Sequence, residues 1–198
     1  RDDTVVQSSL QLDNRPAGYQ RLARVLRRVS GHDDSMHNPD ASQYYRADFD
    51  RQIHEFIDQH RDMLSMCLNG LTEEEARERL VPSKTTLLGL VKHAAFVERV
   101  WFAEAPTGRS RADLGIVGDP DESFELSDDD TIDSVLADFA QACADSRRAV
   151  QETDGDVIWH GNRRGRLSLR WIQLHVLREH AQHCGHADIL REQVLAGR

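Results

Sequence analysis

Cysteine is scarce in this sequence, which contains only Cys67, Cys143 and Cys184 and no Cys-x-x-Cys pair. An odd, widely spaced set of cysteines is more typical of reduced thiols than of a disulfide framework. The sequence also lacks an apolar run long enough to cross a membrane, and its N-terminus lacks the basic-then-apolar pattern of a signal peptide. We therefore expect a cytoplasmic protein without a membrane partner.

Positive charge is also in short supply. The 198 residues carry a formal net charge of -9, and such an acidic protein repels nucleic acids and anionic membranes. Hydrophobic residues make up 39% and charged residues 30% of the chain, which is typical of a soluble domain with a sizeable core. These values exclude nucleic acid as the expected partner and favour a small-molecule substrate.

Helical periodicity dominates from Asp40 onward and predicts four long helices. The first ends at Gly70, the second runs from a cap at Ser83 to Pro106, the third from Ser127 to Gly155, and the fourth from Ser168 to about Leu195. The apolar stripe of the first helix contains Phe49, Ile53, Phe56, Ile57, His60, Leu64 and Leu68. Four amphipathic helices of this length predict an all-α four-helix bundle, a fold that readily builds metal sites between facing helices.

Short elements are expected between the long helices. A capping box that starts at Thr72 predicts a short accessory helix, and residues 106–127 read as loop. Residues 157–159 and 166–168, joined by a glycine-containing turn, predict a small hairpin before the last helix. Residues 1–39 differ in composition from the rest and are predicted to be an N-terminal appendage to the bundle at 40–198, either extended or one amphipathic helix. The same apolar helix faces would serve a monomer's core or a homodimer.

The last predicted helix carries the densest group of chemically useful side chains. An α-helix turns about 100° per residue, which places His175, His186, Glu179 and His183 at roughly 0°, 20°, 40° and 80° around the axis. His180 falls at roughly 140°, away from this stripe. Neighbouring imidazoles and carboxylates on one face can converge on a divalent ion, either zinc or else nickel, manganese or iron. Spacing alone allows three ligand pairs: His175 with Glu179, Glu179 with His183, and His183 with His186.

A catalytic metal usually takes a third protein ligand and keeps one position open. His93 is the best candidate because it borders the apolar face of another long helix, and His60 is the rival because it interrupts the stripe of the first helix. His54, His160 and His180 lie in more polar settings. A lone histidine beside a core is more often a hydrogen-bonded structural residue than a ligand, and a histidine-rich face can simply be solvated.

Three segments carry a family resemblance. They are Leu87–Phe102 (LLGLVKHAAFVERVWF), Ser168–Trp171 (SLRW) and Glu179–Glu192 (EHAQHCGHADILRE). They resemble the DinB-like superfamily of metal-binding four-helix bundles, and most closely the branch related to mycothiol-dependent maleylpyruvate isomerase. The resemblance extends over about Asp48 to Leu195, with the segments in the expected order.

The resemblance implies a ligand set of His93, Glu179 and His183, because that branch has Glu-x-x-x-His in its last helix. His175, His186, His60 and Arg170 are then expected to support the ligands or to contact substrate. His180 and Cys184 depart from the family's pattern. Arg163, Arg164, Arg166 and Arg170 precede or begin the last helix and are expected to meet an anionic substrate or to form a solvated basic loop.

The implied reaction is a metal-assisted transfer or isomerisation of a small electrophile with mycothiol as cosubstrate. The reacting group would be a metal-bound thiolate or water, since no side-chain nucleophile with a partner base is evident. One alternative is a metal-dependent hydrolase that uses bound hydroxide. Another is a non-enzymatic module for metal binding or stress response, which differs from an enzyme in needing no open coordination position.

Overall fold

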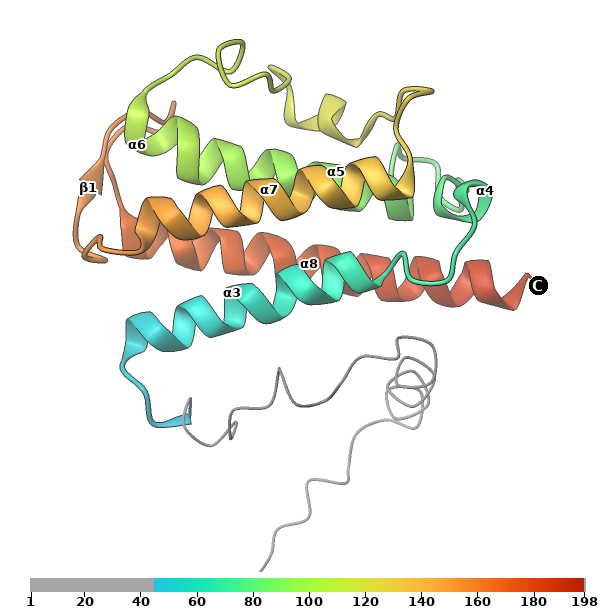
Figure 1. Ribbon diagram of the computed structural model, residues 1–198, viewed down its shortest axis with the longest axis horizontal. Coiled ribbons are helices and arrows are strands. Elements are labelled where there is room, and N and C mark those ends of the chain that lie inside the picture. The colour runs from blue at the N-terminus through green and yellow to red at the C-terminus, as the bar shows by residue number, and fades with distance from the viewer. Residues whose placement is uncertain (1–44, 198) are drawn as a thin grey trace, which may run out of the picture. The chain divides into compact units, whose positions relative to one another are not determined.

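A computed structural model describes residues 45–197, so the predicted N-terminal appendage and its boundary lie outside the described residues (Figure 1). The described chain is mainly helical, with a two-strand hairpin before the last helix, as predicted. Its long helices are α3 (Phe49–Met66), α5 (Leu87–Arg99), α7 (Ile132–Val150) and α8 (Leu169–Ala196). Helix α3 packs mainly against α8, and α5 packs mainly against α7. None of the helices in residues 45–197 has the length and apolarity needed to cross a membrane.

Short helical segments complete the connections. They are α4 (Glu73–Ala76), the π-helical η1 (Val100–Glu104), α6 (Ala105–Thr107) and the 3-10 helix η2 (Pro120–Phe124). Segments η1 and α6 continue α5 without a break to Thr107. The second predicted helix thus ends one residue after Pro106, which is tolerated because it lies in the first turn of α6. Segment η2 packs on α5 within the stretch that was predicted to be loop.

The helix caps decide where each element begins. The capping box at Thr72 and the cap at Ser168 are confirmed, because each side chain accepts a hydrogen bond from the first turn of its helix. The predicted caps at Ser83 and Ser127 are wrong. Helix α5 is capped by Thr86, and α7 by Thr131. Ser127 is engaged elsewhere, since its backbone N–H and its hydroxyl both donate to the Asp130 carboxylate.

The hairpin consists of β1 (Ile158–Trp159) and β2 (Leu167–Ser168), which pair antiparallel. The turn between them runs back to the end of α6, where the Gly161 N–H donates to Ala105 O at 2.9 Å. A Cβ on Gly161 would lie 2.4 Å from Gly108 N, so only glycine permits this approach. The hairpin thereby holds the loop after Gly161 against the C-terminal end of the α5–η1–α6 segment.

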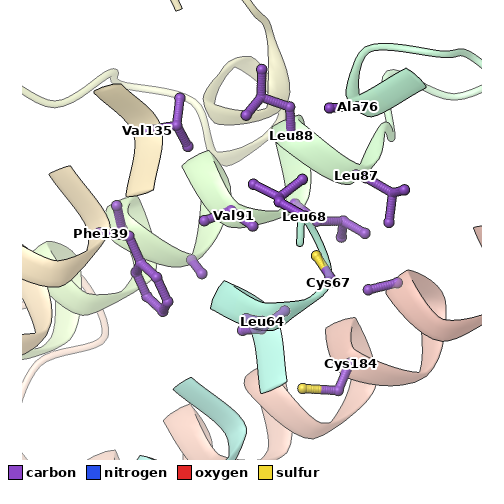
Figure 2. Close-up of a cluster of buried hydrophobic side chains, with 14 of the residues drawn as sticks. Leu64, Cys67, Leu68, Ala76, Leu87, Leu88, Val91, Val135, Phe139 and Cys184 are labelled. Carbon is purple, nitrogen blue, oxygen red and sulfur yellow. The ribbon is translucent and has the colours of Figure 1, made fainter. Parts of the chain in front are cut away.

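The buried side chains form two clusters. One lies around Leu64, Leu68, Val91 and Phe139, toward the α4 end of the bundle (Figure 2). The other contains Ile53, Ile57, Trp101, Phe102, Trp159, Ile172 and Val176. The polar groups of the candidate site lie on helices that both clusters hold in place.

The apolar stripe predicted for the first helix is partly wrong. Phe49 and Phe56 are each 51% exposed, whereas Ile53 and Leu64 are buried as expected. The buried line of α3 also passes through Arg61, which is 6% exposed, and His60 lies beside that line, only partly buried. Apolar spacing missed this because Arg61 is neutralised by a partner on another helix.

Candidate metal centre

The structure brings together three side chains from two helices. His93 lies on α5, and Glu179 and His183 lie one turn apart on α8. Each offers one ligand atom, and these atoms lie within 4.8 Å of one another. The rings of His93 and His183 meet edge to face with centroids 4.8 Å apart, and His183 Nε2 lies 3.8 Å from Glu179 Oε2. Two imidazoles and one carboxylate match the donor set of a catalytic zinc site that keeps one position open.

Hydrogen bonding fixes the tautomer of His93. The Ser123 hydroxyl donates to Pro120 O, so its hydrogen is already used. Ser123 Oγ lies 2.7 Å from His93 Nδ1 and therefore accepts a hydrogen bond from it. The proton is thus on Nδ1, and the lone pair of His93 is on Nε2. Such a contact is what orients a metal-binding histidine.

His183 carries an unsatisfied polar atom. Its Nδ1 is buried and has no hydrogen-bond partner among the described residues. A buried polar atom without a partner carries a cost in free energy of folding. The other nitrogen, Nε2, lies beside Glu179, and two neutral imidazoles with one carboxylate in this arrangement fit a divalent metal.

Burial keeps the two histidines neutral. Desolvation, assisted by the neighbouring His183 and His180, lowers the pKa of His93 to about 3. Desolvation also lowers the pKa of His183 to about 4, with His186 and His180 adding to the effect and Glu179 opposing it. Both rings are then unprotonated at neutral pH, which is the state that a metal requires.

His175 and Arg178 lie on the α8 face that carries Glu179. Arg178 Nη2 donates to His175 Nδ1 at 2.8 Å and to Glu179 Oε1 at 3.3 Å. In neutral His175 the proton is then on Nε2, which lies 3.6 Å from Glu179 Oε1. The His175 ring is also held between Trp101 and Trp171. His175 therefore lies beside Glu179, and its role in supporting that residue stays a prediction.

The remaining residues predicted near the site differ in their placement. The His186 ring is exposed and lies 5.6 Å from the His183 ring. His60 is not among the three residues whose ligand atoms come together, and its Nδ1 is 2.6 Å from Phe56 O in its own helix. Arg170 was expected at the site and is instead paired with Asp50 and Asp156. Those two carboxylates compensate its charge near the start of α8, outside the cavity described below.

A buried ionic network lies beside the site and was missed in the sequence. Arg61 binds the Glu98 carboxylate through Nε at 2.8 Å and Nη2 at 2.6 Å, and His180 Nε2 lies 2.7 Å from Glu98 Oε1. The side chains of Glu98 and His180 are completely buried. Burial opposes ionisation of Glu98, yet the bonds to His180 and Arg61 lower its pKa to about 2.

The network corrects the expectation that His180 lies in a polar setting. Its ring faces the core because Glu98 on α5 supplies a partner. A glutamate within an otherwise apolar helix was the available sequence signal. Sequence spacing, however, could not identify the partners across the bundle.

A cavity of about 180 Å³ adjoins the ligands. His93 and Glu179 line it, together with the aromatic rings of Phe96 and Trp101. A larger hollow of about 660 Å³ shares Phe96 with this cavity, but none of the three ligands lines it. The smaller cavity is therefore where a molecule could reach a metal held by the three residues.

Comparison with known proteins adds one positive finding. The family model described as Mycothiol-S-transferase matches residues 52–196. The matched range contains all three candidate ligands and the four long helices except the first three residues of α3. A search of curated proteins gave no significant match.

Proposed function

The chain belongs to the mycothiol-S-transferase family, a DinB-like helical family, and from that membership we propose that it is a metal-dependent enzyme that transfers a mycothiol-type thiol to a small electrophile. The observation that carries the proposal is the convergence of His93, Glu179 and His183 beside a cavity. Family membership favours transfer over the isomerisation that the sequence resemblance left open.

We propose that His93 binds the metal through Nε2, with Glu179 and His183 as the other protein ligands. Zinc suits this donor set best, and three protein ligands leave a position for an exogenous molecule. A bound divalent ion would supply Lewis acidity, which lowers the pKa of a thiol or water that it coordinates.

The chain's own side chains prepare the site for that chemistry. Ser123 holds the proton on His93 Nδ1, and Arg178 holds His175 and Glu179 in place. Phe96 and Trp101 line the cavity and limit the access of water to the reacting groups.

The thiol is expected to come from a cosubstrate because the protein's own cysteines are unsuited to attack. Cys67, Cys143 and Cys184 are all buried, and burial raises the pKa of each thiol to about 12. Only the thiolate is a strong nucleophile. A soluble low-molecular-weight thiol such as mycothiol meets this need.

Thiol dependence of turnover tests the proposal. Zinc-loaded protein is incubated with a panel of small electrophiles, with and without mycothiol, and product is quantified by mass spectrometry. We expect mycothiol adducts to form faster than in the reaction without enzyme, and the acceleration to be lost in His93→Ala. Turnover that does not require thiol would instead support a hydrolase. Stoichiometric metal without any turnover would support metal sequestration.

A further inference from the structure

The cavity beside the candidate ligands has a charge opposite to that of the whole protein. Arg111, Arg163, Arg164 and Arg178 line it, and among residues 45–197 Glu179 is the only acidic residue in its lining. The chain as a whole has 34 acidic and 25 basic residues, with a net charge of -9. A local excess of guanidinium groups in an acidic protein attracts anions to this point of the surface.

Two of these arginines are already partnered. Arg111 Nε donates to Glu104 Oε2 at 2.9 Å, and its Cζ lies 5.4 Å from the centroid of the Phe96 ring. Arg178 donates to Glu179 Oε1 at 3.3 Å. Their guanidinium groups therefore form part of the cavity wall, and these two carboxylates compensate their charge.

The other two arginines have no acidic partner within the part of the chain that the structure describes. Arg163 and Arg164 are exposed, and neither forms an ion pair with any residue in the described range 45–197. The Arg164 Cζ lies 6.0 Å from the centroid of the Trp101 ring, which forms part of the cavity lining. Two uncompensated guanidinium groups thus lie at the cavity beside His93.

The loop that carries these arginines is anchored at its base. Asn162 is 6% exposed, and its Oδ1 accepts a hydrogen bond from Arg164 N at 3.0 Å. Its Nδ2 donates to Glu104 Oε1 at 3.4 Å. Together with the Gly161 contact to Ala105, these bonds hold the loop against the C-terminal end of the helix that carries His93. A loop fixed in this way presents its charges in a defined position.

Taking the proposed thiol transfer as the reaction, we propose that its electrophile bears a carboxylate and that Arg163 and Arg164 bind this group. A guanidinium matches a carboxylate geometrically and can form paired hydrogen bonds with it. The cavity volume of about 180 Å³ has room for roughly six water-sized groups, so the electrophile is small. The reactive carbon then lies between the arginines and the candidate metal ligands.

Binding is tested first, without any reaction. Zinc-loaded full-length protein is titrated with propionate and with the neutral analogue propionamide, and tryptophan fluorescence reports binding near Trp101. We expect saturable binding of propionate only, weakened at least tenfold in Arg163→Gln and Arg164→Gln. Arg166→Gln is the matched control, because Arg166 is exposed in the same loop but does not line the cavity. Circular dichroism and metal content verify that each variant is folded and loaded.

Three binding results would overturn the proposal. One is the absence of saturable propionate binding, and another is equal binding of propionamide. The third is propionate binding that disappears with the zinc but is unchanged in the two arginine variants, because the carboxylate would then bind only the metal.

A kinetic comparison separates this proposal from the proposed function. Mycothiol is reacted with iodoacetate or iodoacetamide; in both cases a carbon–sulfur bond forms, iodide leaves with the electron pair, and the thiol proton goes to solvent. After the uncatalysed rate is subtracted for each reagent, we expect a lower KM for iodoacetate than for iodoacetamide. In Arg164→Gln the two KM values should be equal. Arginine-dependent propionate binding without turnover of either reagent would refute the transferase and leave the anion site in place. Turnover with equal KM values for the two reagents would refute the anion site alone.

Discussion

His93 Nδ1 lies 2.7 Å from Ser123 Oγ, although the two residues belong to different elements, α5 and η2. The Ser123 hydroxyl is itself committed to Pro120 O, so the contact can only be donated by the histidine. A residue from a connecting segment thus selects which nitrogen of His93 is free to bind a metal. We therefore expect metal affinity to depend on Ser123, although this residue is not one of the candidate ligands.

Ser123→Ala tests that dependence. Loss of the hydrogen bond frees the His93 ring to rotate and to change tautomer, and such supporting contacts typically contribute tenfold to 100-fold in metal affinity. We expect a loss of this size in zinc affinity, measured by competition with a chromogenic chelator. Ser127→Ala, in the same connecting segment but engaged with Asp130, is the control and should leave zinc affinity unchanged.

Gly89→Ala tests the packing of η2 on α5. A Cβ at Gly89 would lie 2.8 Å from Phe124 O, a backbone atom that can yield only if η2 shifts. We expect the free energy of unfolding to fall by about 1–3 kcal/mol, together with weaker zinc binding as Ser123 moves away from His93. The control is Gly185→Ala in α8, where a Cβ meets nothing within 4 Å. That variant should be stabilised by up to about 1 kcal/mol in urea unfolding. Equal effects of the two substitutions would contradict the packing argument.

Glu98→Gln tests the buried ionic network. The substitution leaves the Arg61 guanidinium with only the half-exposed carboxylate of Asp58, and breaking a buried pair in this way costs up to about 3–5 kcal/mol of stability. Asp138→Asn is the matched control, because Asp138 pairs with the adjacent Arg99 at a more exposed position. An exposed pair contributes about 0–1 kcal/mol. Chemical unfolding measures the free energy of unfolding of both variants. Similar losses in the two would contradict the claim that the buried network contributes more to stability than an exposed ion pair.

The stability of the metal-free protein should depend on pH in a defined window. The pKa values of His93 and His183 are lowered from 6.5 to about 3 and about 4 by burial. As pH falls below about 6.5, the unfolded chain therefore binds protons at these histidines and the folded chain does not, which favours unfolding. We expect full stability above pH 6.5 and a progressive loss toward pH 5. Glu98 contributes little to the change in that range, since its pKa is lowered from 4.5 to about 2 and its contribution to stability is lost mainly below pH 5.

Urea unfolding of metal-free protein at several pH values between 7 and 5 measures this dependence. His175 acts in the same direction, because burial lowers its pKa as well. His93→Gln should therefore retain part of the slope but not all of it. A stability that is constant over this range would mean that the histidines are not buried as described.

Local sequence patterns predicted much of the fold. The capping box at Thr72, the cap at Ser168 and the hairpin before α8 all follow from short-range chemistry, and each is confirmed. The caps at Ser83 and Ser127 were wrong because several residues near each helix start could serve, and only tertiary packing chooses among them. The positions of serine and threonine in the sequence do not show which of them caps the helix.

The candidate site, like the fold, could be predicted only in part from the sequence. Helical spacing placed Glu179 and His183 on one face, and family resemblance selected them together with His93, whose ligand atoms are close together in the structure. Ser123 could not be predicted, because nothing in the sequence shows which loop residue folds over His93. His180 was misjudged for a similar reason, since its partner Glu98 is 82 positions away. The homodimer and the identity of the metal stay predictions.

Metal analysis of untagged protein tests the central claim most directly. Wild type, His93→Ala, His183→Ala and the control His60→Ala are purified in parallel, and their metal content is measured by inductively coupled plasma mass spectrometry. His60 was the rival ligand in sequence, but the structure does not bring it together with the other candidate ligands. We expect stoichiometric divalent metal in wild type and His60→Ala, and its loss from the other two. Metal-free wild type, or equal metal in all four proteins, would contradict the account.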